Sequence, residues 1–131
     1  MAADSLIAEV SAFYQAYAEA FHAVSGARIA DFYCTPCLAM RGDGSIHCFQ
    51  SRPEIEKFFH GVADTYYKEG LRRSEFNNLE VVPIGGRCLL ATMEWVFYRG
   101  DGSLLKQWRQ SYNLVRDDRG WKILLSTFHV A

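Results

Sequence analysis

Histidine 129 is the side chain of this sequence best suited to moving a proton. Imidazole titrates near neutrality, so a histidine facing a pocket can act as a general base or donate a hydrogen bond to a ligand. His129 stands at the end of the last alternating segment, on the face that we assign to Gln110 and Trp108. The alternative is a histidine at a strand end that bonds only to backbone. His129 is our candidate catalytic residue.

Five other side chains are candidates for the lining of an apolar pocket. Tryptophan and tyrosine combine a large apolar ring with one N–H or O–H group that can orient a ligand. Glutamine adds an amide with both donor and acceptor. The predicted ligand-binding residues are Tyr17, Trp95, Trp108, Gln110 and Tyr112. The alternative is that these side chains form an ordinary core.

Cys34 and Cys37 form a C-x-x-C motif. Redox motifs of this kind lie at the start of a helix that follows a strand, whereas here a predicted helix precedes a strand. Zinc could recruit His47 or Cys48 as further ligands, but the sequence has no second C-x-x-C and no H-x₃-H pair. We therefore expect inert thiols, no metal and no cofactor.

The charged residues indicate a solvated surface. Arg41, Asp43 and Arg52 surround the first predicted hairpin, and we expect them to form a surface charge cluster. Glu94 and Arg109 are expected to form a cross-strand ion pair, which contributes under about 1 kcal/mol when exposed. Lys and Arg number 14 against 15 Asp and Glu, so the chain lacks the basic face that nucleic-acid binding needs.

The length of 131 residues suits one domain with its own core, so we predict a single domain over 1–131. No apolar run approaches the 18 residues of a membrane span, and the beginning, MAADSLIAEV, lacks the features of a signal peptide. We expect a cytoplasmic protein without a membrane partner.

Apolar residues recur at helical spacing in the first half and alternate in the second half. The sequence predicts helices over 5–24 and 27–33, a hairpin over 37–49, a helix that Ser51 caps and Gly70 ends, and strands over 73–84, 87–99, 104–116 and 121–130. This order predicts an α+β domain with helices on one face of an antiparallel sheet, built from a short hairpin and a four-stranded meander.

A two-residue turn at Asp101-Gly102 would place Trp95 opposite Trp108 and Glu94 opposite Arg109. Alternation then gives an aromatic inner face, with Met93, Trp95, Phe97, Trp108, Gln110, Tyr112, Leu114, Ile123, Leu125, Thr127 and His129. The outer face mixes apolar and polar groups, which favours contact with a partner sheet. A slip of one residue would exchange the two faces.

Three segments carry a resemblance to the nuclear transport factor 2-like superfamily. They are AEVSAFYQAYAEAFHAV, then AMRGDGSIHCFQS leading into PEIEKFF, and WRQSYNLVRDDRGWKILLSTFH. The superfamily includes ketosteroid isomerases, SnoaL-type polyketide cyclases and dehydratases. The resemblance implies a cone-shaped half-barrel, in which a curved sheet wraps around three helices, and a homodimer formed through the outer face. Ketosteroid isomerases use one aspartate as the base and a second, protonated aspartate as a hydrogen-bond donor. The predicted inner face of this chain has no matching acid.

Two functions follow as hypotheses. The first is a small-molecule-binding protein with an apolar pocket, or a cofactor-independent isomerase, cyclase or dehydratase in which His129 is the base. The second is a noncatalytic association module with a filled cone. A cavity of roughly 300 Å³ or more would favour the first, and a cone filled by aromatic side chains would favour the second.

Overall fold

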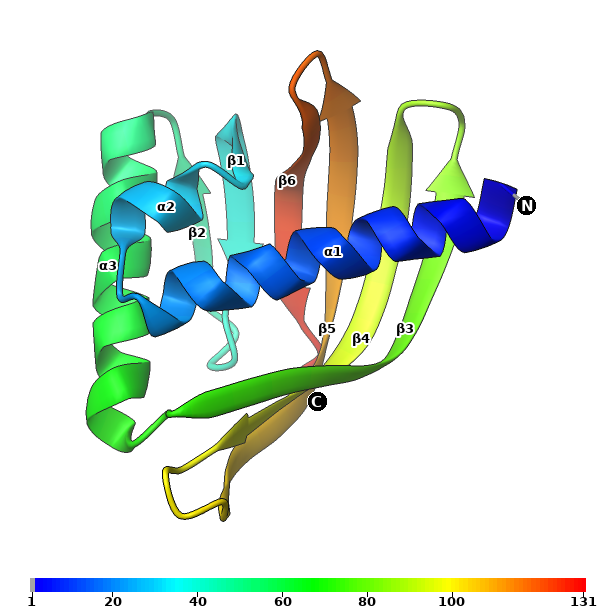
Figure 1. The fold of residues 1–131 in the computed structure, drawn as a ribbon. Coiled ribbons are helices and arrows are strands. Elements are labelled where there is room, and N and C mark those ends of the chain that lie inside the picture. Colours follow the sequence, from blue (N-terminus) through cyan, green and yellow to red (C-terminus); the bar gives the residue numbers. More distant parts are fainter. Residues whose placement is uncertain (1) are drawn as a thin grey trace.

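The computed structural model describes residues 2–131, with side chains from Asp4 onward. Within these residues, three helices and six strands follow one another along the chain (Figure 1). They are α1 (Ala2–His22), α2 (Gly26–Ala30), β1 (Tyr33–Met40), β2 (Ile46–Phe49), α3 (Arg52–Glu69), β3 (Arg73–Ile84), β4 (Cys88–Tyr98), β5 (Leu104–Asp117) and β6 (Gly120–Phe128). None of the described helices is both long and apolar enough to cross a membrane.

The strands form one curved, unclosed sheet in the order β2-β1-β6-β5-β4-β3. Helix α1 lies across the sheet, and α2 and α3 stand together beside β1 and β2 (Figure 1). We call the face covered by α1 the inner face and the opposite face the outer face. The predicted α+β fold, with a hairpin and a four-stranded meander, is confirmed. One pair is not antiparallel, because the hairpin joins the sheet through β1, which runs parallel to β6.

Local signals set the helix ends. Ser51 Oγ accepts a hydrogen bond from the backbone N–H of Glu54 at the start of α3, as predicted. Gly70 ends α3 in the left-handed region, with φ of 116°. Helix α1 ends at His22, before the predicted end at residue 24, because Val24 adopts the left-handed conformation. Gly26 then begins α2, one residue before the predicted start.

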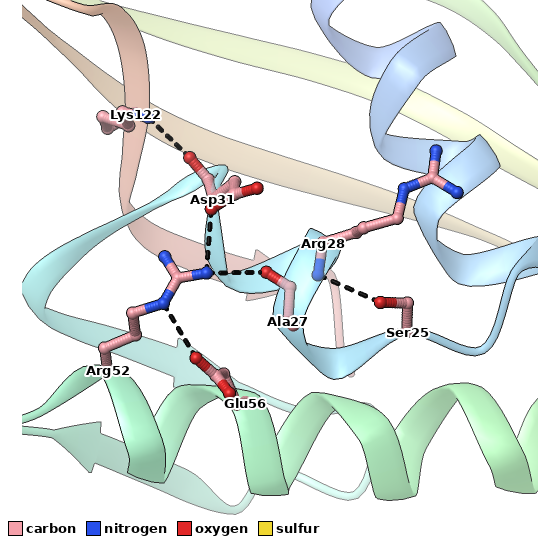
Figure 2. A network of polar contacts seen from close by, with 7 residues as sticks. All are labelled: Ser25, Ala27, Arg28, Asp31, Arg52, Glu56 and Lys122. Carbon is pink, nitrogen blue, oxygen red and sulfur yellow. Dashed lines mark hydrogen bonds and ion pairs between the residues drawn. The ribbon is translucent and has the colours of Figure 1, made fainter.

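Helix α2 packs directly on α3, and both a glycine and an arginine hold this contact. A Cβ atom on Gly26 would lie 2.1 Å from the carbonyl oxygen of Glu56, so only glycine fits there. Arg52 donates to the carboxylates of Asp31 and Glu56, each at 2.8 Å, and to the carbonyl of Ala27 (Figure 2). The predicted surface cluster of Arg41, Asp43 and Arg52 is therefore wrong for Arg52, which instead links two helices.

The predicted pairing of β4 with β5 is confirmed, although the turn between them is different. Trp95 lies opposite Trp108, and Glu94 lies opposite Arg109, but the expected ion pair between Glu94 and Arg109 is absent from the described residues. The loop is longer than two residues, since the N–H of Arg99 bonds to the carbonyl of Ser103. An irregularity in the pairing between Phe97 and Tyr98 compensates for this, so the register of the two tryptophans is unchanged.

Strand β6 departs from the predicted alternation. Ile123 lies opposite Leu114, but beyond an irregularity Ser126 lies opposite Tyr112 and Phe128 lies opposite Gln110. An extra residue in one strand reverses the faces of all residues after it. The predicted inner-face positions of Leu125, Thr127 and His129 are therefore wrong, and Ser126 and Phe128 take their place.

Candidate functional site

A hollow lies on the inner face, between the C-terminal half of α1 and the sheet. Its cavity volume is about 30 Å³, and the atom-free space in and around it, open solvent included, is about 390 Å³. Thirteen residues line it: Tyr17, Ala18, Phe21, Arg41, Tyr66, Leu71, Ser74, Trp95, Phe97, Trp108, Gln110, Tyr112 and Phe128. We call this space the inner hollow.

The structure brings all five predicted ligand-binding residues together around the inner hollow. Trp95 and Gln110 come from the middle of adjacent strands, and both are buried. Tyr17 reaches the same space from α1. The sequence therefore identified which residues meet at the inner hollow.

The polar atoms of this group largely bond to one another. The indole N–H of Trp108 donates to Gln110 Oε1 at 2.8 Å, and Gln110 Nε2 donates to Ser126 Oγ at 2.6 Å. The indole N–H of Trp95 donates to the hydroxyl of Tyr112 at 2.9 Å. These bonds fix the side chains in place, because leaving a buried donor unpaired costs about 1–3 kcal/mol.

The lining offers hydrogen-bond donors rather than a proton acceptor. Burial raises the pKa of Tyr17 and of Tyr112 well above the usual range, because a phenolate there would be poorly solvated. Both hydroxyls therefore stay protonated near neutral pH. Among the described lining residues there is no carboxylate and no imidazole. The arrangement can enclose and orient a molecule.

Arg41 and Phe128 are two lining residues that the sequence analysis did not predict. Arg41 is half-buried, and its guanidinium lies 4.7 Å from the ring centroid of Phe128. The Phe128 ring stacks on Trp108 with 5.2 Å between centroids. A sequence signal for Arg41 was present, because Arg41 directly follows β1 and continues the every-second-residue spacing of Cys37 and Ala39, two small apolar residues that the structure buries. Phe128 was assigned to the outer face because no sequence feature marks the irregularity in β6.

His129 lies away from the inner hollow, and its predicted place on the inner face is wrong. Its Nε2 atom is hydrogen-bonded to Ser111 Oγ at 2.7 Å, and Ser111 Oγ in turn lies 2.7 Å from Thr92 Oγ1. Ser111 and Thr92 occupy the outer face. The irregularity in β6 is the physical reason, because it turns the end of the strand over.

The cysteines of the C-x-x-C motif lie within a strand. The helix predicted to reach residue 33 ends at Ala30, so Cys34 and Cys37 both lie in β1. Burial raises the pKa of the Cys37 thiol to about 12, which keeps it protonated and unreactive. No three His, Cys, Asp or Glu side chains of the described residues gather closely enough to hold a metal ion.

Comparison with known proteins places this fold. The model of a family described as NTF2-like protein (DUF6841) matches residues 8–130. No curated protein matches the chain.

Solved structures resemble the chain over nearly its whole length. The protein Aln2 from a Streptomyces species superposes with a TM-score of 0.78 at 15% identity, covering 95% of this chain and 90% of that one. A Nostoc punctiforme protein with a cystatin-like fold gives 0.78 at 11% identity, covering 98% and 91%. A Xanthomonas campestris protein named after the calcium/calmodulin dependent protein kinase II association domain gives 0.69 at 16% identity, covering 94% and 85%. At these identities the likeness concerns the fold alone.

Proposed function

We propose, from the premise that this chain belongs to the NTF2-like family DUF6841, that it binds a small molecule in the inner hollow. The observation that carries the proposal is the set of polar groups that meet there. Tyr17 on α1, Arg41 just after β1 and Gln110 on β5 surround a space that opens to solvent. A core that only fills the cone has no need of a half-buried charge, because burying a charge is costly.

The size of the hollow limits the ligand. A volume of about 30 Å³ holds one or two water molecules, whereas sites for drug-sized ligands measure roughly 300–1,000 Å³. The ligand is therefore small, or it enters when the ring of Phe128, which no hydrogen bond holds, changes rotamer. The volume taken alone favours the filled-cone alternative, and the chemistry of the lining favours binding.

Two substitutions of alanine by leucine on α1 test the proposal. Ala18 lines the hollow, whereas Ala16 is exposed on the same helix. Ala18→Leu should fill the space and abolish binding of benzoate and benzamide, measured by ligand-observed NMR, and Ala16→Leu should bind them as the wild type does. Equal binding by both variants, or none by the wild type, would refute a ligand site in the inner hollow.

A second candidate function is association through the outer face. One row of paired residues crosses all six strands there, in the order Cys48, Leu38, Leu125, Asn113, Leu90 and Val82. The four aliphatic members are between 36% and 55% exposed. A row of exposed aliphatic residues of this kind, interrupted only by Asn113 and ended by Cys48, supports a protein contact. One structural relative is itself named after an association domain.

We expect this row to join two copies of the chain. Light scattering should then give twice the chain mass of 14.9 kDa for the wild type and a single chain for Leu90→Glu. Ile7→Glu is the matched control, because Ile7 is equally exposed but lies on α1. A monomeric wild type would contradict the homodimer. Dimerisation and ligand binding are compatible, since they use opposite faces of the sheet.

A further inference from the structure

Arg41 places a positive charge at the inner hollow. It follows the last residue of β1, and its guanidinium lies 4.7 Å from the ring centroid of Phe128 and 6.0 Å from that of Phe58. Its Nη2 atom donates to the hydroxyl of Tyr66 at 2.9 Å. These three aromatic side chains hold the guanidinium in one position without neutralising it.

No described carboxylate balances this charge. Arg52, Arg73 and Arg116 each form an ion pair with an acidic side chain, but Arg41 forms none among the described residues. The nearest acid in sequence, Asp43, accepts hydrogen bonds from the backbone N–H and the hydroxyl of Ser45 instead. A guanidinium carries five N–H donors, and among the described side chains only the Tyr66 hydroxyl accepts a hydrogen bond from that of Arg41.

The charge of Arg41 acts on the interior of the hollow. Burial raises the pKa of Tyr17 and of Tyr112, and the positive charge of Arg41 opposes that rise at both hydroxyls. The tyrosines lie on α1 and β5, so the favourable potential for a negative charge extends across the space between them. An anion in the hollow would gain from this potential, because a partly buried charge is screened less than an exposed one.

We infer that the inner hollow binds a small organic carboxylate. Its two oxygens accept hydrogen bonds from the free N–H groups of Arg41, which match a carboxylate in a forked geometry. Its apolar body lies against Trp108 and Phe97, and a body larger than one or two water molecules needs the Phe128 ring to change rotamer, as the proposed function states. A lining with aromatic rings and a single charged group suits a monoanion with an apolar body better than a phosphate, whose higher charge needs more donors. This inference rests on the proposed function and adds the charge and class of the ligand.

Benzoate and benzamide distinguish the contribution of the charge, because they have nearly the same shape and differ in charge. Ligand-observed NMR titration of the wild type should give a lower Kd for benzoate than for benzamide. Arg41→Gln should weaken benzoate about ten- to a hundredfold and leave benzamide within twofold. Arg41→Lys keeps the charge but loses the forked pair of donors. Its Kd for benzoate should lie between those of the wild type and Arg41→Gln. Arg73→Gln is the control, because Arg73 also stacks on an aromatic ring, that of Tyr98, but outside the hollow.

The outcomes separate this inference from the proposed function. If benzamide binds the wild type as tightly as benzoate does, the carboxylate assignment is wrong and the pocket remains. The same holds if a folded Arg41→Gln protein binds benzoate like the wild type. If neither probe binds the wild type, the ligand site itself is refuted, and the carboxylate assignment with it. The wild-type comparison needs no variant, so it decides the question even if Arg41→Gln fails to fold.

Discussion

Two buried tyrosines, one on α1 and one on β5, differ in whether their hydroxyl has a hydrogen-bond partner. The side chains of Tyr14 and Tyr112 are both fully or almost fully buried, and their ring centroids lie 4.6 Å apart. The Tyr112 hydroxyl accepts the indole N–H of Trp95, whereas the Tyr14 hydroxyl has no hydrogen-bond partner among the described residues. The two rings have the same packing role, but their hydroxyls contribute with opposite sign.

Removing each hydroxyl should therefore have a different effect. Tyr14→Phe should leave the free energy of unfolding unchanged or raise it by up to about 1 kcal/mol, because an unpaired buried hydroxyl is lost. Tyr112→Phe should lower it by about 1–3 kcal/mol, because the N–H of Trp95 then lacks its acceptor. Urea unfolding measures both values. A destabilised Tyr14→Phe protein would show that its hydroxyl has a partner.

The buried tyrosines also predict the response to alkaline pH. Burial raises the pKa of Tyr14, Tyr17, Tyr33 and Tyr112 well above the usual value near 10. The native state then keeps protons that the unfolded chain releases, so stability is unaffected below about pH 9 and falls as the pH rises past 10. Each tyrosine adds up to about 1.4 kcal/mol per pH unit to the slope. In urea titrations between pH 8 and 11, Tyr14→Phe should reduce the slope by one tyrosine. An unchanged slope would contradict burial as the cause.

At the scale of elements, the sequence predicted most of what positions the site. The strands β4 and β5 alternate regularly, so Trp95, Trp108, Gln110 and Tyr112 could be placed on one face. Strand β6 could not be placed in the same way, because its irregular pairing depends on how it meets β5 and β1 in three dimensions. His129 was misplaced for this reason. Arg41 was missed because a charge beside a Gly-Asp-Gly turn is usually solvated, and only the folded chain brings Phe128 and Tyr66 to it.

The contact between α2 and α3 gives a prediction with a control inside the same pair of helices. Gly26→Ala should destabilise the protein by about 1–3 kcal/mol, because its Cβ would overlap the carbonyl of Glu56. Gly61→Ala, in the middle of α3 with nothing within 4 Å of its Cβ, should stabilise by about 0.5–1 kcal/mol. Thermal or urea unfolding compares the two. Equal effects would mean that the helices can separate at Gly26 without cost.

At the scale of the whole molecule, the sheet separates two kinds of surface. The inner face carries aromatic rings, a buried amide and one half-buried guanidinium around a small space. The outer face carries the mainly aliphatic row from Cys48 to Val82, together with the hydrogen bonds between Thr92, Ser111 and His129. The curved sheet, covered by α1 on one side, keeps the proposed binding site and the proposed association surface on opposite faces.

The most direct test of binding in the inner hollow uses the three indole N–H resonances of the protein. Trp95 and Trp108 line the hollow, and Trp121 lies outside it beside Arg116. On titration with benzoate, the resonances of Trp95 and Trp108 in a ¹⁵N–¹H correlation spectrum should shift in a saturable way while that of Trp121 stays in place. Three unchanged resonances, or three that move alike, would contradict a ligand site in the inner hollow.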